Sequence, residues 1–293
     1  MCCFCVRQHP WCAISSGEEP RRWNAPSQEL CVELIVLRPR LIASLLLDNS
    51  GLVKTRRFAE PKYVGDVLNA VRIFNEKKTD ELMLMDIGAT RDGRSPDLSL
   101  IQNVASEVRM PLCYGGGVKS VDQVLKIISL GVEKVSINSA ALETPSVLSD
   151  AAKLIGSQSV VATIDIKKVG LRRRYEVVTQ NGTKKTGKDP LELIRQYIDA
   201  GAGEIVVNNV DLDGMMLGYD LEYLSEVAEI SAAPISFLGG AGSLEHIKDL
   251  VTRFGAVGAA AGSLFVFKGK FRAVLINYPT IEERDQLARS VGL

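Results

Sequence analysis

The chain has 293 residues, of which 46% are hydrophobic, enough for one large domain or two small ones with a substantial core. Lysine plus arginine and aspartate plus glutamate both number 35, so no broad basic field is available to gather nucleic acid. No apolar run reaches the roughly 18 residues needed to cross a bilayer. We therefore expect a cytoplasmic protein without a nucleic-acid or membrane partner.

The first 38 residues differ from the rest of the chain. They hold five of the six cysteines and both tryptophans. The cysteine spacing fits no standard zinc pattern, and the apolar stretch is too short for a secretory signal. We expect residues 1–38 to be an extension that is disordered or translated from an early start codon. Residues 39–293 are expected to form the main domain, with no metal and no cofactor.

Apolar runs and helical spacings then alternate along the chain. Strands buried on both faces are apolar throughout, whereas helices that face a sheet repeat apolar residues every three or four positions. Strands are expected at residues 41–47, 81–87, 111–114, 134–137, 160–166, 205–210, 235–238 and 256–261. Helices are expected at residues 62–75, 97–108, 120–130, 145–155, 190–200, 221–230 and 244–251, and in a closing region that runs through residue 271 to residues 281–291.

Two turn signals interrupt this alternation. Residues 48–51 end the first strand, and residues 175–182 predict a small hairpin inserted after the fifth. The whole pattern gives about eight strand–helix units. That number predicts a (β/α)8 TIM barrel, which typically takes about 250 residues. A doubly wound open sheet is the alternative.

An internal repeat favours the closed barrel. The glycine cluster at residues 115–117 is followed, 24 residues after Gly115, by Ser139. A second cluster at residues 239–242 is followed, 24 residues after Gly239, by Ser263. Residues 80–84 and 203–207 match in the same way, so the chain reads as two similar half-barrels of four units each.

Each glycine cluster is a candidate phosphate site. Glycines at a strand–helix turn let backbone N–H groups approach an anion, and barrels commonly bind phosphate at this place. The alternative is that the glycines only make tight turns. The candidate residues are Gly115, Gly116, Asn138 and Ser139 in the first half, and Gly239, Gly240, Gly262 and Ser263 in the second. Two such sites predict a substrate with a phosphate at each end.

Polar residues at the carboxyl ends of barrel strands are catalytic candidates. Asp165 ends the fifth strand and Asp213 follows the sixth, where a carboxylate can move protons. A helix cap or a loop ion pair is the alternative for both. Lys54, expected in a loop after the first strand, can contact a phosphate or a polar intermediate, or be solvated.

The repeat also exposes an asymmetry. When the first strand is placed on the fifth, Leu46 stands where Asp165 stands. A leucine cannot exchange a proton, so a mechanism that needs a symmetric pair of carboxylates lacks one of them. Asp48, two residues beyond, is a candidate substitute.

Four charged residues begin strands at the opposite end of the barrel: Arg40, Glu81, Lys134 and Glu204. They can form a closed ring of ion pairs, or they can be ordinary solvated charges. A ring that closes the barrel floor would be a gate for something small, because the interior is otherwise filled with side chains.

Taken together, the motifs resemble the cyclase subunit of imidazole glycerol phosphate synthase, over about residues 39–274. They are Lys-Val-Ser-Ile-Asn-Ser-Ala-Ala at 134–141, Gly-Ser-Gln-Ser-Val-Val at 156–161, Gly-Ala-Gly-Glu-Ile at 201–205, Asp-Leu-Asp-Gly at 211–214, Gly-Tyr-Asp at 218–220 and Gly-Gly-Ala-Gly at 239–242. The resemblance implies a (β/α)8 barrel lyase of histidine biosynthesis that pairs with a glutaminase subunit in a heterodimer. Ammonia from the partner passes through the barrel and reacts with a bisphosphorylated ribonucleotide.

The resemblance also implies roles for residues. Asp165 matches the family's catalytic acid–base, Asp213 and Lys54 match active-site positions, and the four charged strand starts match its ammonia gate. The family's other catalytic aspartate falls on Leu46. Residues 45–54 instead resemble a cyclase-like branch linked to O-antigen gene clusters of lipopolysaccharide biosynthesis and to glutamine-dependent amidation of sugars.

We therefore expect a paralogue with reduced or altered activity, still supplied with ammonia by a glutaminase. One alternative is glutamine-dependent amidation of a surface-polysaccharide sugar. A second is a non-catalytic barrel that regulates a glutaminase, and a third is an isomerase of phosphorylated sugars. The physiological substrate is left open.

Overall fold

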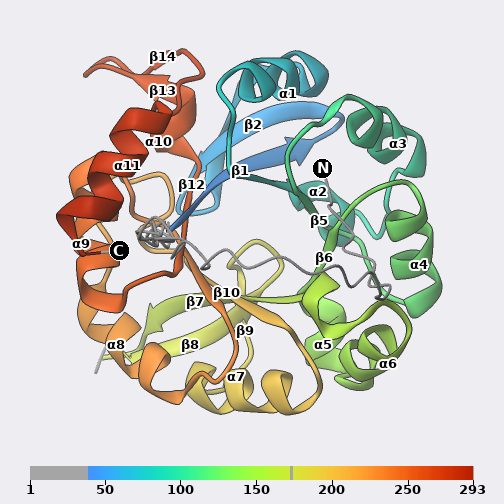
Figure 1. Cartoon of the computed structure of the whole chain (residues 1–293). Coiled ribbons are helices and arrows are strands. Elements are labelled where there is room, and N and C mark those ends of the chain that lie inside the picture. Colours follow the sequence, from blue (N-terminus) through green and yellow to red (C-terminus); the bar gives the residue numbers. More distant parts are fainter. Residues whose placement is uncertain (1–38, 172–173, 293) are drawn as a thin grey trace, which may run out of the picture. The chain divides into compact units, whose positions relative to one another are not determined.

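Eight parallel strands close into a barrel in the part of the chain that this computed structural model describes, residues 39–171 and 174–292. In Figure 1 the barrel is surrounded by a ring of helices. Its strands are β1 (Arg40–Asp48), β4 (Glu81–Asp86), β5 (Leu112–Gly115), β6 (Lys134–Ile137), β7 (Val160–Val169), β10 (Glu204–Asn209), β11 (Ile235–Leu238) and β12 (Gly258–Ala261). Each pairs with the next, and β12 pairs with β1, which confirms the (β/α)8 barrel and excludes the open sheet. The extension expected at residues 1–38 lies outside the described residues.

Helices cover the outside of the barrel with their apolar faces. The longer ones are α1 (Val67–Glu76), α3 (Leu98–Glu107), α4 (Val121–Ser129), α6 (Ser146–Ile155), α7 (Pro190–Asp199), α8 (Leu221–Ile230), α9 (Leu244–Phe254) and α11 (Ile281–Ser290). Three short helices begin just after barrel strands and were not predicted: α2 (Ile87–Arg91), α5 (Ser139–Glu143) and α10 (Ser263–Val266). A four- or five-residue helix has too little apolar periodicity to be recognised in a sequence.

Each half of the barrel extends its first strand with an antiparallel hairpin. Strands β2 (Gly51–Arg56) and β3 (Ala59–Gly65) continue from β1, and β8 (Arg174–Thr179) and β9 (Lys184–Lys185) continue from β7. The hairpin predicted at residues 175–182 is therefore confirmed. The matching hairpins also show the two-fold repeat in the fold itself.

The hairpin of the first half corrects two predictions. Residues 62–65 belong to β3 and not to a helix, because Asp66 caps α1 by accepting a hydrogen bond from the backbone N–H of Asn69. Lys54 lies in β2 and not in a loop. The extended conformation of residues 62–65 was missed because β3 is exposed and carries no apolar alternation.

The predicted closing helical region is correct only at its end. After α10 the chain forms the hairpin β13 (Phe267–Lys268) and β14 (Ala273–Val274), with Phe271 in its turn. Gly269 and Arg272 both have left-handed backbone conformations, at φ 73° and 52°, which a continuing helix cannot contain. Helix α11 follows after the hairpin.

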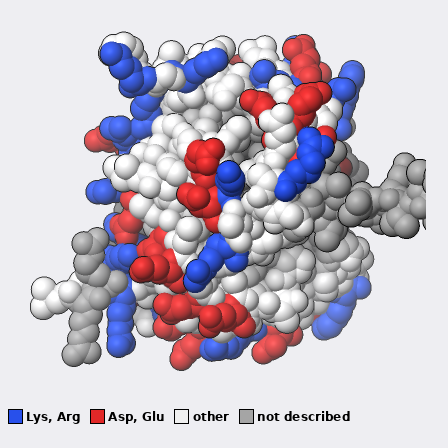
Figure 2. All heavy atoms as spheres, turned by 60° about the vertical axis from the view of Figure 1, so that its left-hand side comes forward, with Lys and Arg blue, Asp and Glu red and all other residues white. Residues whose placement is uncertain are grey.

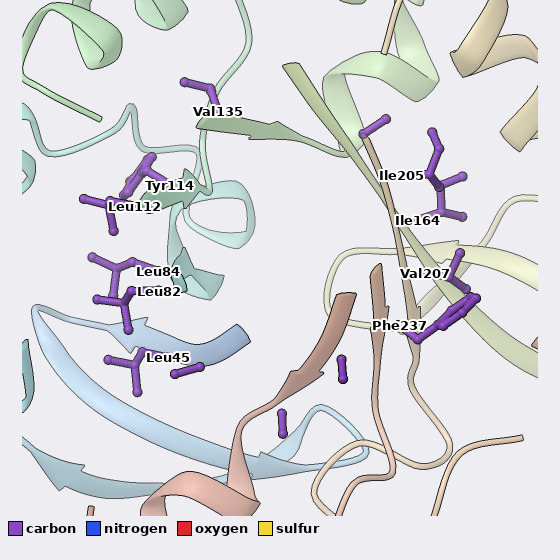
Figure 3. Packing of buried hydrophobic residues seen from close by; sticks show 14 of the residues in the cluster. Leu45, Leu82, Leu84, Leu112, Tyr114, Val135, Ile164, Ile205, Val207 and Phe237 are labelled. Carbon is purple, nitrogen blue, oxygen red and sulfur yellow. The ribbon is translucent and has the colours of Figure 1, made fainter. Parts of the chain in front are cut away.

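Alternate strand residues face opposite sides of the barrel wall. Leu82 and Leu84 of β4 point outward to the helices, as do Ile205 and Val207 of β10, and Figure 3 shows this layer of buried side chains. Met83, between the two leucines, faces inward. Both sides of each strand are therefore buried, which explains the continuous apolar runs.

On the face drawn in Figure 2, basic and acidic side chains lie interspersed, as the zero net charge leads one to expect. Among the described residues, no helix combines the length and apolarity that a membrane span requires.

Candidate functional site

A cavity of about 400 Å³ opens at the carboxyl ends of the barrel strands. It brings together residues that are distant in sequence, as expected when all strands end on the same face. Of the predicted site residues, those that line it are Lys54, Gly116, Asn138, Ser139, Asp165, Asp213 and Gly262. Leu46 lines it as well. Gly115, Gly239, Gly240 and Ser263 do not.

Asp165 near the middle of β7 is held between two amides. Its Oδ2 accepts a hydrogen bond of 2.8 Å from Nδ2 of Asn138, and its Oδ1 accepts one of 3.0 Å from Nδ2 of Asn208. Burial raises the pKa of Asp165 to about 6, although the two amides act in the opposite direction. A carboxyl group with this pKa exchanges protons readily near neutral pH, as a general acid or base must.

Asn208 in β10 was missed by sequence reasoning. It is 7% exposed, lines the cavity, and its Oδ1 has no hydrogen-bond partner among the described residues. The available signal was an Asn-Asn pair that closes the apolar run 205–207 at a strand end. Such a pair belongs at the mouth of the barrel, where buried amides need polar partners.

The first half-barrel has no such arrangement. Asn208 pairs with Asp165 across β10 and β7, and the equivalent pair across β4 and β1 is Met85 with Leu46. The repeat places Gly262 where Asn138 stands. The matched positions of the first half thus hold neither a carboxylate nor an amide.

Lys54 fills the space that Gly262 leaves. A Cβ atom added to Gly262 would meet Nζ of Lys54, so a larger residue there would displace the end of the lysine side chain. The amine donates a 2.6 Å hydrogen bond to the carbonyl oxygen of Ser44, and the residue is 6% exposed. Burial lowers the pKa of Lys54 to about 8, while Asp213 opposes this shift. The sequence alternative of a solvated loop lysine is therefore wrong.

Asp213 follows β10 and accepts a 2.8 Å hydrogen bond from the hydroxyl of Thr55. Burial raises its pKa, and attraction to Lys54 limits that rise. Asp213 and Lys54 thus form a pair of titratable groups of opposite charge, and this pair lines the same cavity as Asp165.

Asp48 does not take the place of the missing carboxylate. It lies outside the cavity lining, and its Oδ1 pairs with Nη2 of Arg91 at 3.0 Å. It ends β1 beyond Leu46, where the chain already turns into the hairpin.

The first glycine cluster borders the cavity and the second does not. Gly116 has φ 115°, and an added Cβ would lie 2.3 Å from the carbonyl oxygen of Asp86. Gly240 has φ 122°, and an added Cβ would lie 2.1 Å from the carbonyl oxygen of Gly218. Both glycines are required by the backbone, so the tight-turn explanation accounts for their presence. Ser263 is buried beyond the cavity lining.

The four charged strand starts form a closed ring at the opposite end of the barrel. Arg40 contacts Glu81 at 2.6 Å and Glu204 at 2.8 Å, and Lys134 contacts the same carboxylates at 2.9 Å and 2.8 Å. Both glutamates are buried. Burial would raise the pKa of Glu204, but the hydrogen bonds and charges of Arg40 and Lys134 outweigh it and hold the pKa below its ordinary value.

An apolar cluster fills the barrel interior between this ring and the cavity. It consists of Ile42, Met83, Cys113, Val161, Val206, Leu238 and Ala260, of which Met83 and Leu238 also line the cavity. Above it, Ser136 and Thr163 share a 2.7 Å hydrogen bond, and both line the cavity floor. The barrel axis therefore runs from a charged floor through an apolar layer to a polar cavity.

Fold and site together define a (β/α)8 barrel with its cavity at the carboxyl ends of the strands, the usual place of the active site in this fold. Residues 40–272 match the family described as histidine biosynthesis protein. The chain belongs to this family.

Three relatives illustrate the similarity. A protein of Leptospira borgpetersenii named "Putative imidazole glycerol phosphate synthase subunit HisF" is 54% identical over 252 residues, which are 86% of this chain and 99% of the relative. One from Pseudomonas aeruginosa with a name of the same form, ending in hisF2, is 49% identical over 85% of this chain and 99% of its own. The imidazole glycerol phosphate synthase subunit HisF of Streptococcus mutans is 37% identical over 78% of this chain and 91% of its own.

Proposed function

We propose that this chain is an ammonia-using synthase barrel of the cyclase type, with chemistry altered from that of imidazole glycerol phosphate synthase. A glutaminase subunit supplies the ammonia through the charged ring at the barrel floor. The substrate carries a phosphate at each end and lies across the cavity. The observation that carries the proposal is the alignment of the ring, the apolar layer and Asp165 along one barrel.

The ring suits the entry of a small amine. Glu81 and Glu204 bear negative charge that is already balanced by Arg40 and Lys134. Ammonia is neutral and can pass an apolar layer, whereas ammonium cannot without a desolvation cost of several kcal/mol. In this proposal the ring of four charged residues closes the barrel floor to bulk water. A glutaminase subunit bound at that floor would release ammonia next to the ring.

Asp165 is suited to move the protons of an incoming amine. When ammonia attacks a carbon atom, the nitrogen becomes positively charged and must lose a proton to a base. A carboxyl group with a pKa of about 6 accepts that proton near neutral pH and can return it to a leaving group. Lys54 and Asp213 add charge that a phosphorylated substrate can use for orientation.

The altered chemistry is supported by the apolar first half. Loss of one general acid or base typically costs about 10²–10⁴-fold in rate. Leu46 and Met85 replace both members of the polar pair, and Asp48 is held by Arg91. Amidation of a surface-polysaccharide sugar is the second candidate, because residues 45–54 resemble the cyclase-like branch linked to that chemistry.

The test supplies the purified chain with an ammonium salt and the bisphosphorylated ribonucleotide of the histidine pathway. We expect slow or no ring closure, at least about 100-fold below that of a histidine-pathway cyclase. Turnover equal to that of such a cyclase, and abolished by Asp165→Asn, would show that the chemistry is unaltered. If Asp165→Asn changes neither product formation nor the activity of an added glutaminase, the barrel is not catalytic.

A further inference from the structure

The hairpin β13–β14 carries a cationic side chain back to the mouth of the barrel. The backbone N–H of Arg272 closes the turn on the carbonyl oxygen of Gly269 at 3.0 Å. Its guanidinium then lies over the ring of Phe267, 4.9 Å from the ring centre. Neither this hairpin nor this arginine was singled out in the sequence.

Arg272 joins two loops that follow barrel strands. Its Nη2 donates a 2.9 Å hydrogen bond to the carbonyl oxygen of Gly214, after β10, and a 3.3 Å bond to the hydroxyl of Ser263, after β12. Gly214 in turn packs on β2, since an added Cβ would lie 3.2 Å from Cα of Arg56. The arginine therefore sits at the rim beside the cavity walls formed by Asp213 and Gly262.

Further cations converge on the same rim. Nζ of Lys62 in β3 lies 5.4 Å from the centre of the Phe267 ring, so two cations share one aromatic side chain. Arg56 is close enough to lower the pKa of Arg272, together with burial. Asp213 is the carboxylate that opposes this effect. Arg56 and Asp213 thus both lie near Arg272, Lys62 shares Phe267 with it, and Asp213 also interacts with Lys54.

Like charges gathered without a matching anion are destabilising, and they favour the binding of an anion. Nε and Nη1 of Arg272 have no hydrogen-bond partner among the described residues, so the guanidinium keeps N–H donors for an anion. Arginine suits a contact with a phosphate because its charge is permanent and its bonds to an anion are charge-assisted.

We infer that Arg272, with Lys62 and Arg56, binds a phosphate group of the substrate at the rim next to Ser263. The inference rests on the proposed function in one respect, that the substrate is phosphorylated. It assigns the second-half anion site mainly to charged side chains of two hairpins, and less to the glycine turns. Arg272 then decides which substrates enter, because a substrate without this anion leaves three cations unmatched.

The first experiment measures binding of inorganic phosphate by calorimetry at constant ionic strength. A Ser139→Asp background repels phosphate from the first half, so that the second-half site is measured alone. We expect Arg272→Gln to weaken phosphate binding by about 10- to 100-fold, and Arg272→Lys to recover part of the loss. The matched control is Arg253→Gln, an exposed arginine of α9 held by Ser225, which should leave the affinity unchanged.

Lys62→Gln keeps the inference testable if Arg272→Gln does not fold, and we expect a loss of a few-fold in phosphate affinity. Equal affinities of Arg272→Lys, Lys62→Gln and the parent protein would overturn the inference, as would the absence of phosphate binding by the parent.

The second experiment separates binding from a merely structural role. A phosphate that does not react is held equally in the ground and transition states, so its loss raises KM and leaves kcat unchanged. With an active phosphorylated substrate, Arg272→Gln should raise KM about 10-fold at unchanged kcat. A fall in kcat alone would mean that Arg272 only holds the loop at Gly214. If no substrate is turned over, the proposed function fails, while the phosphate titration still decides this inference.

Discussion

Asp165 is the residue on which the proposed chemistry depends, and its burial has a predicted effect on stability. Burial raises its pKa to about 6 in the folded protein, whereas an aspartate in an unfolded chain has a pKa near 3.9. Between these values the folded state binds more protons than the unfolded state. The free energy of unfolding contributed by Asp165 is therefore highest below pH 3.9 and falls as the pH rises through about 6.

We predict that Asp165→Asn raises the free energy of unfolding at pH 8 by about 1–3 kcal/mol, because the charged form is no longer buried. The new amide can also donate to Oδ1 of Asn208, which lacks a partner among the described residues. Urea unfolding at pH 8 and pH 4.5 measures the difference, which should shrink at the lower pH. Asp150→Asn, at an exposed carboxylate, serves as the control. A variant less stable than the parent protein at pH 8 would contradict this account of Asp165.

Substitution of Leu46 tests whether a second carboxylate, matched to Asp165 by the repeat, would restore ring closure. It lines the cavity at the position that the repeat matches to Asp165. We predict that Leu46→Asp raises ammonia-dependent ring closure by no more than about 100-fold, because Met85 and Gly262 supply no amides to hold the new carboxylate. Burial of the carboxyl group costs some stability. Leu46→Asn has nearly the same shape but exchanges no proton, and should give no gain. Equal rates for the two variants would show that the carboxylate at this position is not what limits the reaction.

Some of these residues can be read from the sequence and others cannot. Asp165 stands out because a carboxylate at the end of an apolar strand has few structural reasons to be there. Asn208 does not, since an amide near a strand end is common and its partner comes from another unit. The burial of Lys54 depends on the glycine opposite it, 208 residues further along, which no local pattern predicts.

The ring of four charged residues is assembled from four barrel strands, each of which contributes its first residue. Each member begins a different strand, and closure of the barrel brings the four starts together. The depressed pKa of Glu204 means that the ring stabilises the fold above the ordinary pKa of a glutamate, and that this stability is lost as the pH falls through the lower folded value.

We predict that Glu204→Gln lowers the free energy of unfolding by about 1–3 kcal/mol at pH 7, because Arg40 and Lys134 each lose a buried partner. Glu107→Gln removes an exposed pair with Arg72 and should change it by less than about 0.5 kcal/mol. Chemical unfolding of both variants gives the comparison. Equal losses for the two would mean that the ring is no more than surface charge.

At the scale of elements, seven of the eight barrel strands were predicted within two residues at each end, because burial on both faces leaves a clear apolar run. Strand β7 runs three residues beyond its predicted end, to Val169, so Asp165 lies within it and does not end it. The hairpins β2–β3 and β13–β14 were missed, since β3 is mostly exposed and β13 and β14 have two residues each, too few to show a period. Those two hairpins hold Lys54 and Arg272. These two residues of the site therefore lie in elements whose structure the sequence indicates only weakly.

For the whole molecule, the two-fold repeat was the most informative feature of the sequence. It predicted closure of the barrel, and the paired hairpins after β1 and β7 bear it out. The repeat also predicted that the halves differ, because Leu46 falls on Asp165. That the two amide partners of Asp165 have no counterparts in the first half became visible only in the structure. One half carries Asp165, the proposed acid–base group, and the other carries the buried amine of Lys54.

The central claim is that the two halves each bind one phosphate group of a single substrate, with Asp165 between them. A crystal structure of the protein grown in inorganic phosphate tests it most directly. The account predicts two bound phosphate ions at the carboxyl ends of the strands, one beside Ser139 and Gly116 and one beside Ser263 and Arg272, on opposite sides of Asp165. Phosphate at only one of these places, or at neither, would contradict it.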